Sequence, residues 1–244
     1  MDKMRISIIV PAFNEERLLA ASLAAIRSAT AVFTERGWAC ELIVCDNNST
    51  DRTEEIARAA GARVVFEPVN QIARARNTGA AAASGDWLLF IDADSHPDPE
   101  LFAEVAERIE SGRVLGGGAT IRMDNVNWTA RMVTALWNLV SRSGKLVAGS
   151  FIFVEAAAFR EIGGFSHEWY AGEELEFCQR LKKQARKTKR RITILHRHPI
   201  QTSGRKIDLY TPWETLWMLA RAAITGGRSL RSRETTHLWY DGRR

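Results

Sequence analysis

The sequence predicts an α/β fold in which a mostly parallel central sheet is flanked by helices. Short apolar runs alternate with segments whose apolar residues recur at helical spacing. In the first half this alternation repeats four times, with no internal repeat and no low-complexity stretch. Such a pattern is typical of parallel strands joined by right-handed helical crossovers. Polar and acidic residues directly follow several of the apolar runs, which is where ligands bind in open α/β sheets.

The first half of the chain contains four expected strands, each a short apolar run that ends at a turn residue or a polar cluster. These strands are expected at 6–10, 41–45, 62–66 and 87–91. Helices are expected after each of them, where apolar residues recur at helical spacing or alanine predominates. The first helix is expected to open at 14–16, and the others to span 52–60, 71–83 and about 99–111.

The second half alternates less regularly. Strands are expected at 116–123, 149–154 and 192–195, and helices at 155–162 and 173–183. Between the first two strands, an apolar helical stripe is formed by Trp128, Met132, Leu136 and Leu139 or Val140. Near the end, Thr211-Pro212-Trp213-Glu214 has a capping-box pattern with proline at the first helical position. It predicts an amphipathic helix with one apolar face, made of Trp213, Leu216, Trp217, Ala220 and Ile224.

The composition is that of a soluble globular protein, with 45% hydrophobic and 26% charged residues. The net charge of +5 is unevenly distributed, because residues 182–191 (KKQARKTKRR) hold seven basic side chains. Such a run suits phosphates, anionic lipid headgroups or nucleic acid, and it is equally typical of a solvated surface. No nucleic-acid-binding module accompanies it, so we expect no nucleic-acid partner.

The three cysteines are odd in number and show no CxxC spacing, which indicates a reducing compartment. The first residues show no signal-peptide pattern, and no apolar stretch is long enough to span a membrane. From these observations we expect a cytoplasmic protein.

Two carboxylates one residue apart, Asp92 and Asp94, follow the expected strand at 87–91. Such a pair can hold a hard divalent cation, which in turn can bind a diphosphate. Polar residues also follow two other strands, at 11–16 and 46–51, and parallel strands would bring all three clusters to one edge of the sheet. The alternative is that these residues only cap helices or make local turns. For residues 48–50 (Asn-Ser-Thr) we favour that alternative.

Four segments resemble the family 2 glycosyltransferases of the GT-A fold, in the order and spacing of that family. They are SIIVPAFNEE, IVCDNNSTDRT, ARARNTGAAAASGDWLLFIDADS and IGGFSHEWYAGEELEFCQRL, between about Ile6 and Leu181. The resemblance implies a GT-A, Rossmann-like fold and an enzyme of the hexosyltransferase class. It further implies an inverting, metal-dependent transfer of a sugar from a UDP- or GDP-sugar to a hydroxyl or phosphate, with Mn²⁺ or Mg²⁺ as the metal.

The resemblance also implies roles for individual residues around the donor. Pro11, Phe13 and Glu15 match the motif that binds the nucleoside, with Phe13 where tyrosine is common. Asp46 matches the aspartate that contacts the base or ribose. The DxD motif comprises Asp92, near ribose and diphosphate, Ala93, also on the donor side, and Asp94, the metal ligand.

An acidic pair near a helix start, Glu173-Glu174, occupies the place of the family's Glu-Asp pair. The second member usually serves as general base, which takes the proton of the acceptor hydroxyl as that hydroxyl attacks the anomeric carbon. We therefore expect Glu174 to be the base, although it is one methylene longer than the usual aspartate. The alternative for the pair, and an equal one for Glu173, is simple stabilisation of a helix N-terminus.

Three further groups are candidates for binding, and two of them have an alternative interpretation. His198 is a candidate metal ligand, with His196 as its alternative, and both are also typical surface residues beside a basic run. The TSGRK segment at 202–206 is similar to a family loop, in which Arg205 and Lys206 would bind the diphosphate. Arg74 and Arg76 are either ligand contacts or surface charges, and the sequence does not choose between them.

The expected organisation is one glycosyltransferase domain at 1–206, with a nucleotide-binding half (1–115) and an acceptor-binding half (116–206). Residues 207–244 form a C-terminal amphipathic helix and basic tail, which either packs on the domain or contacts an anionic membrane peripherally. The acceptor is a saccharide, a lipid phosphate or a small molecule, and the oligomeric state is left open. The alternatives are a non-catalytic nucleotide- or carbohydrate-binding module and, less favoured, a phosphatase, whose DxD normally follows the first strand.

Overall fold

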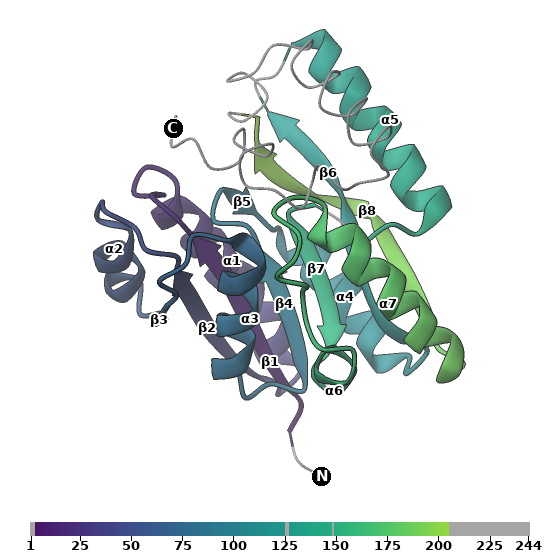
Figure 1. The fold of residues 1–244 in the computed structure, drawn as a ribbon. Coiled ribbons are helices and arrows are strands. Elements are labelled where there is room, and N and C mark those ends of the chain that lie inside the picture. The colour runs from purple at the N-terminus through teal and green to yellow at the C-terminus, as the bar shows by residue number, and fades with distance from the viewer. Residues whose placement is uncertain (1–2, 125–126, 148, 205–244) are drawn as a thin grey trace.

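The computed structural model describes residues 3–124, 127–147 and 149–204. They form a three-layer α/β fold with helices on both faces of one eight-stranded sheet (Figure 1). The strand order is β3-β2-β1-β4-β7-β6-β8-β5. The strands are β1 (Arg5–Ala12), β2 (Ala39–Asp46), β3 (Arg63–Phe66), β4 (Trp87–Ile91), β5 (Ser95–His96), β6 (Val114–Asp124), β7 (Phe151–Glu155) and β8 (Arg191–Ser203). The helices are α1 (Leu19–Glu35), α2 (Thr53–Ala59), α3 (Ile72–Ala82), α4 (Pro99–Glu110), α5 (Trp128–Gly144), α6 (Ala156–Glu161) and α7 (Glu173–Lys187).

The first four strands are parallel, as the alternation predicts, and the expected elements of this half are confirmed. One boundary differs, because α1 begins at Leu19 rather than at 14–16. Residues 14–16 instead form a loop whose backbone N–H groups donate to side chains of the loop after β2. Asn14 also adopts a left-handed backbone conformation, with φ of 52°, which no helix accommodates.

The second half of the sheet is mixed. β7 lies between β4 and β6 and runs antiparallel to both, whereas β6 and β8 are parallel to each other. β8 is longer than the expected 192–195, and the two-residue strand β5 that pairs with it was not predicted. The extension includes His196, His198 and Pro199, a composition that is atypical of a strand. The register of the β6–β8 pair shifts between Ala119 and Ile121.

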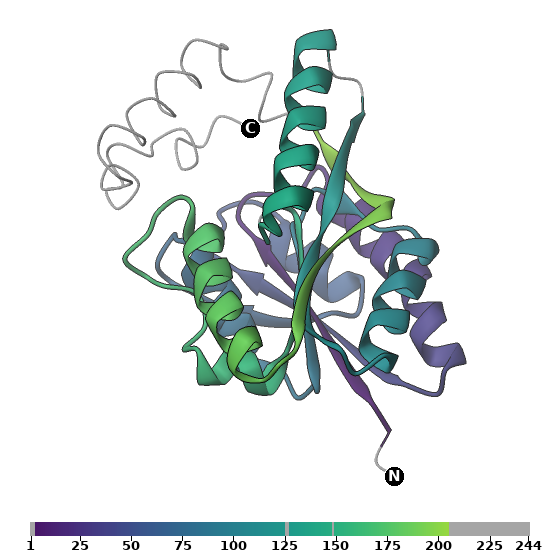
Figure 2. The same cartoon turned by 90° about the vertical axis from the view of Figure 1, so that its right-hand side faces the viewer.

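The buried residues form one apolar cluster on each face of the sheet. One cluster includes α1, α2 and α4, with Phe33 stacked on Phe102. The other includes α3, α6 and α7, where Phe90, Phe165 and Phe177 are in ring contact. Figure 2 shows these helices on opposite sides of the sheet.

Helix α5 differs from the other long helices. It forms as its apolar spacing predicts, but the stripe is exposed to solvent rather than buried against the sheet. None of the described helices is long and apolar enough to cross a bilayer. The predicted helix after Thr211, together with Arg205, Lys206 and the basic tail, lies outside the described residues.

Candidate active site

The loops after β1 and β2 are joined by hydrogen bonds at the carboxyl edge of the sheet. Asp46, the last residue of β2, is paired in register with Ala12, the last residue of β1. The N–H of Asn14 donates to Ser49 Oγ at 3.0 Å, and the N–H of Thr50 donates to Asn14 Oδ1 at 2.8 Å. Because β1 lies between β2 and β4, the three polar strand ends are neighbours, as predicted.

The predicted nucleoside-binding residues line this joined pair of loops. Pro11 is buried at the end of β1, Phe13 is half-buried and Glu15 is buried, with its N–H donating to Thr53 Oγ1 at 2.8 Å. Asp46 is buried and its Oδ1 accepts the N–H of Ser49 at 3.1 Å. These hydrogen bonds fix the backbone around each predicted contact.

Residues 48–50 take part in the hydrogen bonds that join the loops after β1 and β2. They shape the loop, with Asn48 in a left-handed conformation. The side chain that holds the start of α2 is Asp51, whose Oδ1 accepts the N–H of Thr53 at 2.9 Å. Desolvation raises the pKa of Asp51, but hydrogen bonds from the Thr53 hydroxyl and from the N–H groups of Glu16 and Thr53 stabilise the ionised carboxylate and lower the pKa below its ordinary value.

The DxD turn is held between two segments that are distant in sequence. The N–H of Asp92 donates to the carbonyl of Ser150 at 3.1 Å, and the carbonyl of Asp94 accepts the N–H of Ser203 at 3.2 Å. Asp94 and Ala93 are both buried, at 4% relative exposure. The end of β8, and with it the start of the 202–206 segment, therefore lies beside the DxD turn.

A buried arginine joins the DxD turn to the acidic pair. Arg76 on α3 is 1% exposed, and its Nη1 donates to Glu173 Oε1 at 2.9 Å. Its Nη2 donates to Glu174 Oε1 at 2.7 Å and to Asp92 Oδ1 at 3.1 Å. We call Arg76, Asp92, Glu173 and Glu174 the carboxylate–arginine cluster. The three carboxylates raise the pKa of Arg76 above its ordinary value despite its complete burial, so it stays charged.

The two glutamates of the cluster differ in environment. The side chain of Glu173 is 5% exposed, and its burial, reinforced by the negative charge of Glu174, raises the pKa of Glu173 to about 8. The side chain of Glu174 is 19% exposed, and its Oε2 accepts the N–H of Gly149 at 3.0 Å. Glu174 and Asp92, at 20%, are thus the cluster members that solvent reaches.

Arg76 was one of the two arginines whose role the sequence left open. The signal that identifies it is its helical phase, because Ala73, Arg76 and Ala80 recur on the buried face of α3. A charged side chain on a buried arc requires partners of opposite charge.

Two side chains at and within α3 hold the loop before α7. Gln71 Nε2 donates to the carbonyls of His167 and Trp169, and Asn77 Nδ2 donates to the carbonyl of Phe165. The sequence analysis did not identify this role of Gln71 and Asn77.

The acidic turn supplies two carboxylates as candidate ligands for a divalent ion. In the part of the chain that the structure describes, no three or more His, Cys, Asp or Glu side chains gather as a metal site. Mg²⁺-type ions are commonly held by one or two carboxylates plus substrate phosphates, and Asp92 and Asp94 fit that mode. His198 lies four residues along β8 from Thr202, the partner of Ser95, a separation of about 13 Å. The register therefore separates His198 from the turn.

Comparison with known proteins matches residues 7–162 to the model of glycosyl transferase family 2. An uncharacterized glycosyltransferase of Mycobacterium bovis is 32% identical over 141 residues, which cover 56% of this chain and 60% of that protein. The undecaprenyl-phosphate 4-deoxy-4-formamido-L-arabinose transferase of Pseudomonas aeruginosa is 32% identical over 139 residues, covering 52% and 40%. The chain thus spans 60% or less of the length of these relatives.

Solved structures share the fold at lower identity. TarS from S. aureus (residues 1–349) superposes with a TM-score of 0.64 at 19% identity, covering 88% of this chain and 64% of that one. Glucosyl-3-phosphoglycerate synthase from Mycobacterium tuberculosis, in complex with Mn²⁺, UDP and phosphoglyceric acid, gives 0.59 at 21% identity, covering 91% and 76%. These similarities confirm the GT-A fold.

Proposed function

The chain belongs to glycosyl transferase family 2, and from this we propose that it is an inverting, metal-dependent glycosyltransferase. It transfers a sugar from a UDP- or GDP-sugar to an acceptor hydroxyl or phosphate. The observation that carries the proposal is the carboxylate–arginine cluster, in which Arg76 holds Asp92 of the DxD turn beside Glu174. Without Arg76, three carboxylates could not share so small and buried a space.

The donor occupies the carboxyl edge of the sheet in this proposal. Pro11, Phe13 and Glu15 contact the nucleoside, and Asp46 contacts the base or ribose. Asp92 and Ala93 border the ribose and diphosphate, and Arg205 binds the diphosphate. The complexes of TarS with UDP-GlcNAc and of the M. tuberculosis synthase with UDP favour a UDP-sugar.

Glu174 acts as the general base. Its carboxylate takes the proton of the acceptor oxygen while that oxygen forms a bond to the anomeric carbon, and the bond from that carbon to the diphosphate breaks. Arg76 and the N–H of Gly149 each bind one oxygen of Glu174 and so fix its orientation. Each oxygen retains a second lone pair for the incoming proton. Glu173, buried and with a raised pKa, is unsuited to face the acceptor.

A divalent ion, Mn²⁺ or Mg²⁺, is the cofactor of the proposal, with Asp94 as its ligand. When bound, the ion neutralises charge that develops on the departing diphosphate. The M. tuberculosis synthase supports this assignment, since its complex contains Mn²⁺.

The acceptor and its location complete the proposal. The P. aeruginosa relative acts on undecaprenyl phosphate by name, which favours a lipid phosphate over a saccharide or a small soluble molecule. Residues 1–115 serve the donor and residues 116–206 the acceptor. The protein works in the cytoplasm, at the inner face of the membrane when its acceptor is a lipid, and binds no nucleic acid.

The donor assignment predicts that UDP or GDP binding depends on metal through Asp94. Mn²⁺ should increase the rise in melting temperature that the nucleotide causes, because a ligand that binds only the folded state stabilises it. Asp94→Ala should abolish the Mn²⁺ increment, whereas Asp98→Ala, which removes only the cap of α4, should retain it. Equal nucleotide binding with and without metal in the wild-type protein contradicts the assignment.

The assignment of the base predicts that Glu174→Gln binds the donor normally but loses transfer, with turnover reduced by about 10²–10⁴-fold. Donor binding is measured by thermal shift and transfer by release of nucleotide diphosphate. Glu173→Gln is the matched control and should retain most of the transfer. If only Glu173→Gln loses transfer, the general base is Glu173 and not Glu174. If transfer is unchanged in both variants, the site works without a catalytic base at these positions.

A further inference from the structure

Helix α5 turns its apolar side chains away from the protein. The residues that pack it against the sheet are small or polar, with Ala130, Thr134 and Ser141 buried. Asn138 Oδ1 accepts the N–H of Ile121 on β6, and Asn138 Nδ2 donates to the carbonyl of the same residue. The large apolar side chains are exposed instead: Trp128 (74%), Leu136 (62%), Leu139 (60%), Val133 (57%), Met132 (54%) and Val140 (44%).

These exposed side chains form one continuous face. At 100° per residue they fall within an arc of about 140°, on the side of α5 opposite its buried residues. Seventeen residues give the face a length of about 25 Å. In Figures 1 and 2 α5 lies at the outside of the fold, beside the ends of β6 and β8. We call this surface the α5 face.

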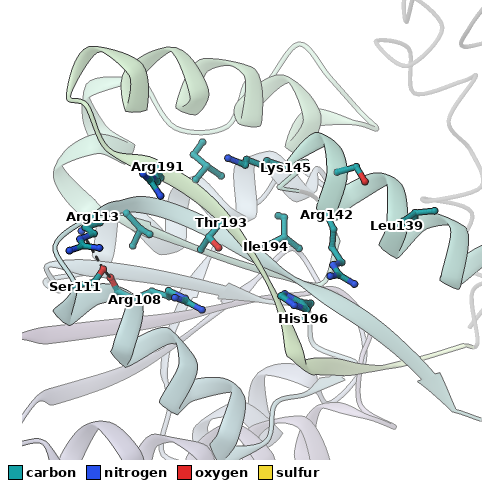
Figure 3. Close-up of a pocket in the computed structure, with 13 residues that line it drawn as sticks. Arg108, Ser111, Arg113, Leu139, Arg142, Lys145, Arg191, Thr193, Ile194 and His196 are labelled. Atoms are coloured by element: carbon teal, nitrogen blue, oxygen red, sulfur yellow. Dashed lines mark hydrogen bonds between the residues drawn. The ribbon is translucent and has the colours of Figure 1, made fainter.

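A basic cavity adjoins the C-terminal end of the α5 face. It has a volume of about 640 Å³ and lies between α4, α5 and β8, with Leu139 shared between cavity and face. Its charged and titratable lining residues are all basic: Arg108, Arg113, Arg142, Lys145, Arg191 and His196. Figure 3 shows these side chains around the cavity: Arg108 lies on α4, Arg142 on α5, Arg191 and His196 on β8, and Arg113 and Lys145 in the segments that follow α4 and α5.

Most of this positive charge is not neutralised within the fold. Arg108 pairs with Glu104, but the described residues provide no ion pair for Arg113, Arg142, Lys145 or Arg191. The basic run at 182–191 ends at Arg191 and so leads into the cavity. On α5 itself, Arg131 and Arg142 are three turns apart and flank the apolar arc on one side. An exposed apolar face bordered by cations is the composition of a helix that lies in a membrane interface.

We propose that the α5 face and the basic cavity together bind the surface of an anionic lipid bilayer. The apolar side chains enter the boundary between headgroups and acyl chains, and the cavity binds the phosphate of an anionic lipid. Charge selects this occupant over two others. A second copy of the chain carries the same net positive charge of +5, and residues 205–244, with eight basic and four acidic side chains, are also net positive.

The surface proposed here is separate from the C-terminal helix, since it consists of described residues alone. It does not depend on the proposed function, because lipid binding is measured without donor or acceptor. Its position nevertheless suits a lipid acceptor: α5 ends at Gly144, and the chain reaches Gly149, whose N–H binds Glu174, five residues later.

The test is sedimentation of the full chain with vesicles. Vesicles of phosphatidylglycerol and phosphatidylcholine should bind the protein, and vesicles of phosphatidylcholine alone should bind it at least about tenfold less, with binding weakened by salt. Leu136→Asp and, separately, Arg142→Glu should each lower the partition coefficient by about fivefold or more. Phe66→Asp and Arg58→Glu are matched controls, because both residues are exposed but lie at the opposite edge of the sheet, on β3 and α2. Both controls should bind like the wild type.

A second set of measurements tests whether the variants remain folded and whether residues 205–244 or a second copy of the chain already covers the α5 face. The fluorescence of an environment-sensitive dye on Leu136→Cys should shift to shorter wavelength when anionic vesicles are added, with the unsubstituted protein, labelled identically, as reference. Unchanged melting temperatures for Leu136→Asp and Arg142→Glu show that these variants remain folded. The proposal is overturned if the wild type fails to bind anionic vesicles, or if the α5 and cavity variants bind like the controls. It is equally overturned if the dye already reports a buried environment without vesicles, since residues 205–244 or a second copy would then cover the face.

Discussion

At the scale of single residues, the charges of the candidate active site are tightly balanced. Arg76 donates to three carboxylates and is itself completely buried. One guanidinium cannot compensate three negative charges, and the raised pKa of Glu173 follows from this deficit together with burial. The cluster thus retains a proton at neutral pH, on the least exposed of its three carboxylates.

The raised pKa of Glu173 predicts a pH dependence of stability. In the unfolded chain Glu173 ionises near its ordinary value of 4.5, whereas in the folded protein it ionises at about 8. Between these values the folded state binds the additional proton, so its free energy of unfolding falls as pH rises through this window. Glu173→Gln cannot ionise and should show a smaller fall in melting temperature between pH 5 and 8. The measurement is a thermal melt at each pH, with Glu176→Gln on the same helix as control, and equal slopes for the wild type and Glu173→Gln contradict the expectation.

The sequence predicted individual site residues only as far as a motif or a strand end identified them. Asp46, Asp92 and Asp94 follow strands, and the structure brings the three strand ends together as expected. Arg76 was not assigned, because its partners are 16, 97 and 98 residues away and no local pattern pairs them. His198 was placed by residue type alone, without knowledge of the register of β8.

At the scale of elements, the position of β6 in the sheet between β7 and β8 depends on glycine. A Cβ atom at Gly117 would lie 2.1 Å from the carbonyl oxygen of Thr193, a backbone atom that cannot move without displacing β8. Gly118 is less confined, since its nearest contact would be at 3.1 Å. Gly117 therefore permits a close approach of β6 and β8 that no larger residue would allow.

This difference predicts that Gly117→Ala is markedly more destabilising than Gly118→Ala. The first substitution overpacks a backbone contact and should lower the free energy of unfolding by about 2 kcal/mol or more. The second should cost less, since its nearest contact is an ångström longer. Urea denaturation of the two variants measures the difference, and equal midpoints would show that β8 adjusts to the added methyl group.

The elements were predictable where side-chain periodicity determines them. Strand β4 and helix α4 match their expected ranges almost residue for residue. The start of α1 was placed too early, because tertiary hydrogen bonds to the loop after β2 occupy the backbone of residues 14–16. The apolar period of α5 predicted a helix correctly, but periodicity does not state whether the apolar face points inward or outward.

At the scale of the whole molecule, two halves of the chain meet at β7 and at the carboxylate–arginine cluster. Arg76 and Asp92 come from the first half, and Glu173 and Glu174 from the second. The parallel direction of the strands in the first half followed from the alternation of strands and helices. The reversed direction of β7 did not, because no local pattern distinguishes a parallel from an antiparallel buried strand.

The shared position of Arg76 predicts that Arg76→Met destabilises the entire fold. Removing the only cation of the cluster leaves buried carboxylates unpaired, and the free energy of unfolding should fall by about 3–5 kcal/mol. Arg76→Lys should recover only part of this loss, since one ammonium cannot reproduce the planar geometry of the guanidinium. Chemical denaturation at pH 7 measures both variants, with Arg74→Met, on the same helix, as control. A loss below 1 kcal/mol in Arg76→Met would show that the carboxylates take up protons without structural cost.

The place of β7 in the sheet also determines what the chain exposes during its synthesis. β1 to β4 can pair as soon as residue 91 has been made, but the free edge of β4 is covered only when β7 follows, after β6 and α5. Until then the wholly apolar segment WLLFI presents unpaired backbone groups to other chains. Nascent or refolding molecules should therefore aggregate through this strand, and a chaperone that recognises short apolar segments would find its binding site there.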